Sequence, residues 1–174
     1  VILASNSPRR KELLSGLGIC YEVKTLPGIE ESYPDTLSGE EIPVFIACEK
    51  ADAYRQTMHS DELIITADTI VWLDGLVMGK PEDEEDARRM LRCLSGKTHQ
   101  VITGVCLTTT EFQKSFATVT DVTFAELTEE EIDYYVQKYK PMDKAGSYGI
   151  QEWIGFVGVE GITGSYFNVM GLPI

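Results

Sequence analysis

An apolar run between Leu63 and Leu73 is interrupted by a single acid, Asp68. The residues on either side are typical of a buried strand, ending at Ala67 and resuming at Ile70. Burying an ionised carboxylate without a partner costs several kcal/mol, so the Asp68 side chain must meet a cation, a metal or a water-filled cleft. Such a carboxylate can bind a divalent metal or accept a proton from an attacking water. The alternative is a structural aspartate that makes backbone hydrogen bonds at a bulge.

Strand-like and helix-like segments alternate along the chain, which predicts an α/β domain with a mixed sheet. The 174 residues are expected to form a single domain, residues 1–174, with room for two lobes around a cleft. The expected strands are 1–4, 63–73, a hairpin partner at 76–78, 101–107 and 116–124, with short strand-like pieces at 156–157 and 167–170. The expected helices follow Ser7, Pro81 and Thr128, and a further one spans 43–55.

The charge balance limits the partners of the chain. With 15 Lys+Arg against 28 Asp+Glu, the net charge is -13. A surface this acidic repels a phosphate backbone, which argues against non-specific binding to nucleic acid or to an anionic membrane. No apolar stretch is long enough to cross a bilayer, and the four cysteines lack the spacing of a zinc site or of a disulfide scaffold. We therefore expect a cytoplasmic protein in which any anionic ligand is held by a local cluster of positive charge.

Basic residues follow Ser7-Pro8 at the start of the first expected helix, beginning with Arg9 and Arg10. The helix N-terminus already presents positive charge, so each cation costs roughly 0.3–1 kcal/mol there unless an anion neutralises it. A bound phosphate turns that cost into a gain, because free backbone N–H groups, the hydroxyls of Ser5 and Ser7 and the guanidinium groups all contact it. The alternative is a solvated basic turn.

Further polar residues are candidates for the same site. Lys80 follows the hairpin that Asp68 leads into, and Lys50 lies near the apolar stripe of its expected helix. Glu30 and Glu31 lie together in a loop, where paired carboxylates can share a magnesium ion. Each of these residues is also compatible with an ordinary surface position, so only their combination favours a site.

Several short segments together carry a resemblance that none carries alone. They follow one another along nearly the whole chain and are Ala4-Ser5-Asn6-Ser7-Pro8-Arg9-Arg10, Ala67-Asp68-Thr69-Ile70-Val71, Gly79-Lys80-Pro81, Leu94-Ser95-Gly96-Lys97-Thr98-His99-Gln100-Val101, Asp143 to Gln151, Gly164-Ser165-Tyr166 and Gly171-Leu172-Pro173. In this order they resemble the Maf family of nucleoside triphosphate pyrophosphatases.

The resemblance implies hydrolysis of a nucleoside triphosphate between its α and β phosphates, giving a monophosphate and pyrophosphate, with a divalent metal cation, Mg²⁺ or Mn²⁺. It implies an elongated mixed sheet flanked by helices, two lobes around a cleft as in inosine triphosphate pyrophosphatases, and a homodimer. By resemblance Asp68 is the proton acceptor for water and, with Glu31, a metal ligand. The substrate-binding residues that it implies are Ser5, Ser7, Arg9, Arg10, Lys50, Thr69, Lys80 and Gln151.

Three positions separate the branches of the family. The branch acting on dTTP and UTP carries Arg, Thr and Gln there, as Arg9, Thr69 and Gln151 do in this chain. The branch acting on 7-methyl-GTP carries Trp, Gln and Glu, which suit a cationic methylated purine. The resemblance therefore implies dTTP and UTP, with modified pyrimidine triphosphates, as substrates cleared from the nucleotide pool. The alternatives are a 7-methyl-GTP pyrophosphatase and a nucleotide-binding regulator of septum formation.

The chain departs from the family pattern at two places. It ends at Ile174, where family members usually continue into a C-terminal helix. In addition, Glu152-Trp153 follow Gln151, where small residues or glycine are usual. An acid and a bulky indole beside the implied base pocket are expected to affect the fine substrate preference.

Overall fold

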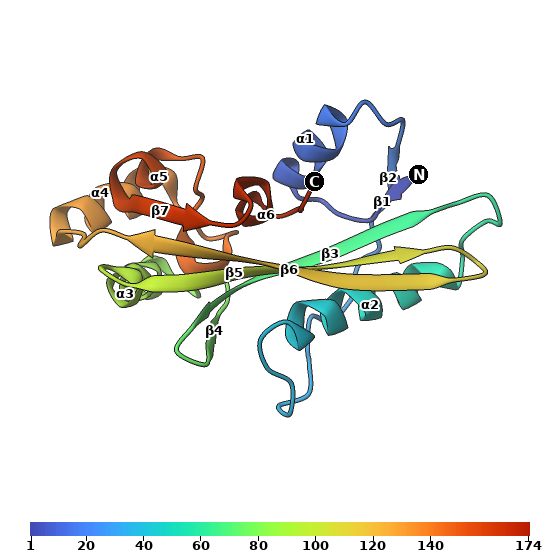
Figure 1. Ribbon diagram of the computed structural model, residues 1–174, viewed down its shortest axis with the longest axis horizontal. Coiled ribbons are helices and arrows are strands. Elements are labelled where there is room, and N and C mark those ends of the chain that lie inside the picture. The colour runs from blue at the N-terminus through green and yellow to red at the C-terminus, as the bar shows by residue number, and fades with distance from the viewer. The chain divides into compact units, whose positions relative to one another are not determined.

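The structure is a computed structural model that describes residues 1–174, in which strands and helices alternate (Figure 1). The strands are β1 (Ile2–Leu3), β2 (Glu22–Val23), β3 (Ile64–Leu73), β4 (Leu76–Met78), β5 (Thr98–Thr108), β6 (Gln113–Phe124) and β7 (Val159–Thr163). The helices are α1 (Pro8–Gly16), α2 (Glu41–Arg55), α3 (Glu84–Leu94), α4 (Glu129–Tyr139), the short 3₁₀ helix η1 (Ala145–Ser147), α5 (Trp153–Gly158) and α6 (Tyr166–Met170). None of these helices combines the length and the apolar character that crossing a bilayer requires.

The seven strands form one sheet in the order β2-β1-β3-β5-β6-β7, with β4 paired to β3. β1 runs parallel to β2 and to β3, whereas the β3–β4 and β6–β7 pairs are antiparallel. Asp74 and Gly75 turn β3 into β4 with positive φ angles of 50° and 81°. The predicted mixed sheet and its hairpin are therefore confirmed.

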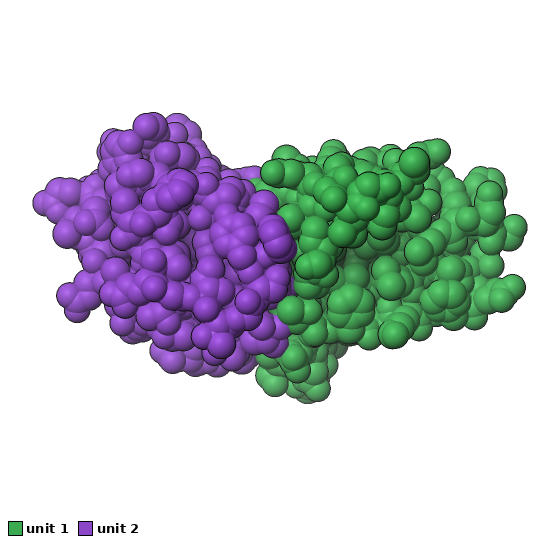
Figure 2. All heavy atoms as spheres, turned by 45° about the horizontal axis from the view of Figure 1, so that its top comes forward, with its two compact units in different colours: residues 1–69, 102–118, 171–174 green, residues 70–101, 119–170 purple.

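The chain divides into two compact units, coloured green and purple in Figure 2. Unit 1 comprises residues 1–69, 102–118 and 171–174, and unit 2 comprises residues 70–101 and 119–170. By chain position, β3, β5 and β6 supply residues to both units.

The first helix of unit 1 begins as its sequence predicts. The Arg10 N–H donates to Ser7 Oγ at 3.3 Å, which makes Ser7 the N-cap, and Pro8 is the first helical residue. Leu13 and Leu14 are buried. Leu17 is 50% exposed, because α1 ends at Gly16 and Leu17 lies at the C-cap.

Close contact between α2 and β5 fixes the second helix of unit 1. A Cβ atom on Gly104 of β5 would lie 2.3 Å from the Pro43 carbonyl carbon, so only glycine allows this approach. Ala47 packs against Cys106 of β5, and the Thr66 hydroxyl of β3 donates to the Ala47 carbonyl oxygen at 2.7 Å. The helix begins at Glu41 rather than at Pro43, and its predicted C-terminal end at Arg55 is confirmed.

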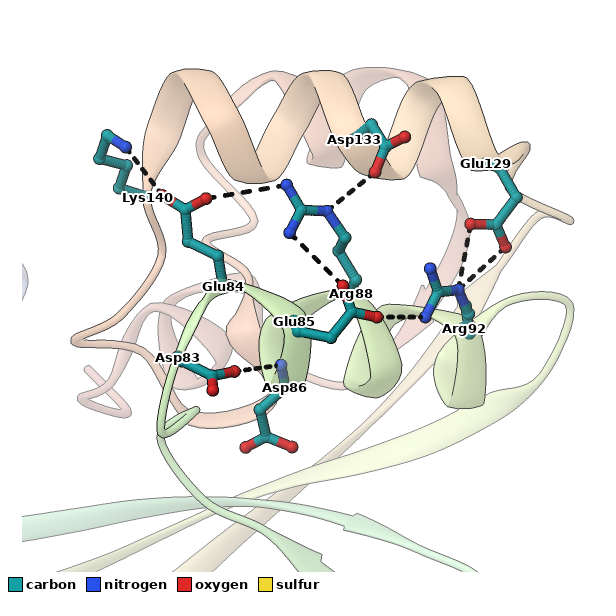
Figure 3. A network of polar contacts seen from close by, with 9 residues as sticks. All are labelled: Asp83, Glu84, Glu85, Asp86, Arg88, Arg92, Glu129, Asp133 and Lys140. Carbon is teal, nitrogen blue, oxygen red and sulfur yellow. Dashed lines mark hydrogen bonds and ion pairs between the residues drawn. The ribbon is translucent and has the colours of Figure 1, made fainter.

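In unit 2, ion pairs join α3 to α4 (Figure 3). Arg88 of α3 donates to Asp133 of α4 at 2.8 Å, and Arg92 contacts Glu129 at 3.0 Å. The remaining residues drawn there are Asp83, Glu84, Glu85, Asp86 and Lys140. We call these nine residues the α3–α4 ion-pair network. Asp83 caps α3 by accepting from the Asp86 N–H, and the predicted cap of α4 is present, because Thr128 accepts from the Glu131 N–H.

Two predicted strand pieces are wrong. Residues 156–157 belong to α5 and residues 167–170 to α6, whereas the strand of this region is β7 between them. A run of two to four apolar residues does not distinguish a helix from a strand. Phe156 is also 84% exposed, so its apolar character does not reflect burial. β7 escaped prediction because three of its five residues are exposed and show no apolar alternation.

Candidate functional site

Asp68 lies inside β3, which continues through it without interruption. Its side chain is in a largely buried environment, and the residue as a whole is 8% exposed. The carboxylate therefore needs a charged partner to be stable at this position.

Lys50 of α2 supplies that partner. Its Nζ atom donates to Asp68 Oδ1 at 3.1 Å and lies 3.4 Å from the Ala67 carbonyl oxygen. The same ammonium group forms an ion pair with Glu31 Oε1 at 2.9 Å. Only 14% of the Lys50 side chain is exposed, so one partly buried cation joins two carboxylates.

The two neighbouring loop acids point to different surroundings. Glu31 contacts Lys50, whereas Glu30 lines a separate pocket of about 690 Å³. That pocket lies between the loop 26–34 and one face of α2 that includes Phe45 and Glu49. Glu31 is thus the loop acid that belongs to the Asp68 cluster.

Arg10 of α1 reaches toward the same strand. Its Nε atom donates to the Gly171 carbonyl oxygen at 2.7 Å, and its Nη2 atom donates to Thr69 Oγ1 at 3.1 Å. Thr69 Oγ1 in turn shares a hydrogen bond of 2.8 Å with Thr103 Oγ1 of β5. Because Thr69 follows Asp68 in β3, the first helix and the buried acid converge within unit 1.

Burial and charge act against each other at this cluster. Burial raises the pKa of the Asp68 carboxyl, while Lys50 and Arg10 lower it and Glu31 raises it. Burial likewise lowers the pKa of the Arg10 guanidinium, against the raising effect of Asp68. A carboxylate with a raised pKa is a stronger proton acceptor than an exposed aspartate.

The predicted serines lie at the start of α1. Ser7 Oγ accepts the capping hydrogen bond, and the Ser7 N–H donates to Ser5 Oγ at 3.1 Å. Arg9 is half-buried on the same first turn, and its charge lowers the pKa of Arg10. The start of α1 thus combines two guanidinium groups with two hydroxyl groups.

Unit 1 brings together most of the predicted site residues, namely Ser5, Ser7, Arg9, Arg10, Glu31, Lys50, Asp68 and Thr69. The other two belong to unit 2, where Lys80 is exposed and Gln151 is half-buried. The Gln151 Oε1 atom is buried and accepts no hydrogen bond within the protein. The roles of these two residues stay predictions.

Sequence reasoning missed two members of the cluster. Thr103 is fully buried in the apolar strand β5, and this polar residue inside an apolar run was the signal available. Gly171 contributes only its carbonyl oxygen, which a sequence does not reveal. Its φ angle of 127° is one that glycine adopts most readily.

Comparison of the chain with known proteins identifies its family. The model of the family described as Maf-like protein matches residues 1–174. A Phocaeicola vulgatus protein named dTTP/UTP pyrophosphatase is 81% identical over 174 residues, which are 100% of this chain and 90% of the relative. Bacteroides fragilis and Flavobacterium psychrophilum proteins of the same name are 71% and 50% identical, covering 100% and 99% of this chain and 90% and 88% of those relatives.

A solved structure was also found, that of the Staphylococcus aureus Ham1 protein. It is 18% identical with a TM-score of 0.49 and covers 72% of this chain and 71% of that chain, a likeness too low to bear on the fold. The family match over the full length and the relatives at 50–81% identity carry the assignment. The chain belongs to the Maf-like protein family.

Proposed function

We propose that this chain is a nucleoside triphosphate pyrophosphatase that hydrolyses dTTP and UTP to the monophosphate and pyrophosphate. The relatives that carry this name support it, together with membership of the family. The observation that carries the proposal is the buried Asp68 carboxylate, whose pKa is raised by burial, beside the cations Lys50 and Arg10. A base next to clustered positive charge suits hydrolysis of a polyanion.

The start of α1 and Lys50 bind the phosphates in this proposal, together with Lys80. The free N–H groups and the partial positive charge of a helix N-terminus favour an anion. Ser7 Oγ accepts one hydrogen bond from Arg10 N–H, which leaves its own O–H group to donate. Arg9 and Lys50 add charge-assisted hydrogen bonds to the phosphate oxygens.

Asp68 accepts the proton of the attacking water. The water oxygen forms a bond to the α phosphorus while the bond from that phosphorus to the α–β bridging oxygen breaks, and pyrophosphate leaves. Lys50 and Arg10 favour the ionised form of Asp68, because both lower its pKa against the effect of burial. Thr69 and Thr103 hold Arg10 close to this carboxylate.

A divalent metal, Mg²⁺ or Mn²⁺, fits the donor set of this cluster. Glu31 and Asp68 direct carboxylate oxygens toward the same ammonium group, at 2.9 and 3.1 Å. No group of three or more His, Cys, Asp and Glu side chains is arranged to hold a metal alone. One or two carboxylates completed by substrate phosphates and water are the usual environment of Mg²⁺. The bound metal would neutralise charge on the phosphates and so favour attack.

Gln151, with Arg9 and Thr69, distinguishes the base in this proposal. Thymine and uracil share an imide N–H flanked by two carbonyl oxygens, and a glutamine amide offers one acceptor and two donors to such an edge. The buried Gln151 Oε1 accepts no hydrogen bond within the protein, so an imide N–H that donates to it would satisfy this acceptor. A site with an unpaired acceptor discriminates against bases that offer no donor there. Modified pyrimidine triphosphates that keep this edge are expected substrates as well.

The proposal extends to the cellular setting that the family resemblance implies. We propose a cytoplasmic homodimer that clears these nucleotides from the pool. The acidic composition supports the absence of a nucleic-acid partner. Sedimentation of the purified protein at several concentrations tests the dimer, and a monomer throughout would contradict it.

A pyrophosphate-release assay over a panel of nucleoside triphosphates with Mg²⁺ tests the function. We expect dTTP and UTP to have the highest kcat/KM, and turnover to stop when the metal is chelated. Preferred turnover of 7-methyl-GTP would overturn the substrate assignment. Tight binding of every nucleotide without turnover would overturn the enzymatic one.

A further inference from the structure

We propose that Tyr135 is a positioning residue for base selection, because its hydroxyl group fixes both ends of the segment that carries Gln151. The inference rests on the proposed role of Gln151 as the residue that contacts the base. It concerns α4 of unit 2, which contributes no other residue to the proposed function.

The Tyr135 hydroxyl makes two hydrogen bonds to one short segment. It donates to Glu152 Oε1 at 2.7 Å and accepts from the Gly149 N–H at 3.0 Å. Gly149 and Glu152 are the residues on either side of Ile150-Gln151. A single buried hydroxyl group thus restrains the segment both before and after Gln151.

Glu152 is itself held in place, which makes it an effective acceptor. Lys144 Nζ lies 3.6 Å from Glu152 Oε1. A Cβ atom on Gly149 would lie 2.6 Å from the same oxygen and 2.9 Å from Lys144 Cε, so the three residues are closely packed. Glu152 is the acid that departs from the family pattern, and its position explains why this chain tolerates an acid there.

The segment is also fixed from the side of α5. A Cβ atom on Gly155 would lie 1.8 Å from the Ile150 carbonyl oxygen, so the first turn of α5 contacts the backbone directly before Gln151. With the backbone restrained on both sides, the direction of the Gln151 amide depends on these contacts. A small shift of the backbone would misalign the amide with an imide edge, whereas the phosphate contacts would remain.

The hydroxyl group can be removed without loss of the ring packing. Tyr135 is fully buried, and its ring stacks on Tyr139 at 5.1 Å with an interplanar angle of 23°. Burial and the hydrogen bond to Glu152 raise the pKa of Tyr135, so the hydroxyl stays protonated over the assay range. The change Tyr135→Phe therefore isolates the two hydrogen bonds.

The experiment measures kcat and KM of the full chain and of Tyr135→Phe for dTTP, UTP and dCTP. It also measures the inhibition constant of inorganic triphosphate, which carries no base. We expect kcat/KM for dTTP and UTP to fall about 5- to 20-fold, mainly through KM, the usual effect of losing one or two buried hydrogen bonds. The inhibition constant of triphosphate and the low rate on dCTP should stay unchanged. An equal loss for all nucleotides, or no loss, would overturn the inference.

Variants of Glu152 supply a matched control for Tyr135→Phe and a second test of the positioning role. Glu152→Gln keeps an acceptor oxygen for Tyr135 and should retain the preference, whereas Glu152→Leu removes one of the two hydrogen bonds and should lose part of it. The double variant Tyr135→Phe with Glu152→Leu should lose no more than Tyr135→Phe alone, because that change already removes the contact with Glu152. If Tyr135→Phe fails to fold, the Glu152 pair decides, and equal base preference in Glu152→Gln and Glu152→Leu would refute the positioning role.

Gln151→Ala separates the failure of this inference from that of the proposed function. If Gln151→Ala leaves the preference for dTTP and UTP unchanged, Gln151 does not contact the base and both statements fail. If Gln151→Ala abolishes the preference while Tyr135→Phe keeps it, only the positioning role of Tyr135 is wrong.

Discussion

Two clusters of charged side chains in this protein use the same residue types in opposite environments. The Asp68 cluster of unit 1 joins two carboxylates through one Lys50 ammonium group that is 14% exposed. The α3–α4 ion-pair network of unit 2 contains more ion pairs, but most of its side chains are exposed (Figure 3). The number of ion pairs therefore says little about where the chemistry lies.

The difference lies in solvent screening. Around the exposed network, water and salt weaken each pair, so a single substitution has a small effect. Around Asp68, burial raises the pKa of the carboxyl and makes each neighbouring charge matter. The comparison predicts strong functional effects in unit 1 and weak effects on stability alone in the network.

The largest effect is expected for Asp68→Asn. The amide cannot accept the proton of the attacking water, so turnover should fall by about 10²–10⁴-fold, the usual contribution of a general base. Lys50 keeps its ion pair with Glu31, and the fold should be retained. Pyrophosphate release and thermal unfolding measure the two quantities, with Asp133→Asn of the network as the matched control. Near-normal turnover of Asp68→Asn would mean that another group activates the water.

The next effect is a change in pH dependence for Lys50→Met. Lys50 lowers the pKa of Asp68, so without its charge that pKa should rise further. Because the base must be ionised, the acidic limb of the kcat/KM profile should move to higher pH. The control Lys140→Met removes a lysine that pairs with exposed Glu84, and its profile should match that of the wild type. If the acidic limb of the Lys50→Met profile does not move, Lys50 does not control the pKa of Asp68.

His99 adds a third kind of site, a buried ionisable group without a charged partner. Burial lowers the pKa of His99 from 6.5 to about 4, and its Nε2 atom shares a hydrogen bond of 2.6 Å with the Tyr148 hydroxyl. In the unfolded chain His99 is protonated below about pH 6.5, whereas in the folded chain it stays neutral down to about pH 4. The free energy of unfolding therefore decreases as the pH falls from 6.5 to 4.

Chemical unfolding at pH 7 and pH 5 measures this linkage. Relative to His99→Gln, which does not titrate, the wild type should lose about 2 kcal/mol of unfolding free energy between the two values. Equal losses in both proteins would show that His99 is not the group responsible. An exposed histidine such as His59 offers the matched control, and His59→Gln should follow the wild type.

The smallest effect is expected for Arg92→Met in the network. Arg92 contacts Glu85 and Glu129, and all three side chains are exposed, so these surface ion pairs contribute little and Tm should fall by only about 2–4 °C. The difference from the wild type should shrink in 1 M NaCl, where the Debye length is about 3 Å. Turnover should not change. A large loss of activity would show that the exposed network and the buried cluster are not independent.

Local signals in the sequence were sufficient for much of the fold. Capping residues such as Ser7 and Thr128 act within one turn of their own helix, so their effect can be predicted from neighbouring residues alone. Short apolar runs near the C-terminus could not be assigned in this way. There the choice between helix and strand depends on close tertiary contacts such as that of Gly155 with the Ile150 carbonyl.

For the candidate site, the sequence predicted which kind of group Asp68 must contact more readily than which residue supplies that group. An acid in an apolar strand had to meet a cation, and Asp68 does. Lys50 was a candidate for the same site, but its direct contact with Asp68, 18 positions away, depends on how α2 lies against the sheet, which Gly104 allows by its lack of a side chain. The hydrogen bonds of Tyr135 to Gly149 and Glu152 were beyond prediction for the same reason, because they join segments distant in the chain.

The hydrogen bond from Arg10 to the Gly171 carbonyl joins residues 161 positions apart. During synthesis on the ribosome, α1 emerges well before the Gly171 carbonyl group that accepts this hydrogen bond. A nascent chain that already contains Asp68, Lys50 and Glu31 therefore still lacks the contact that anchors Arg10. The arginine reaches its final orientation only when translation has passed residue 171, so a growing polypeptide does not carry a completed cluster before that point.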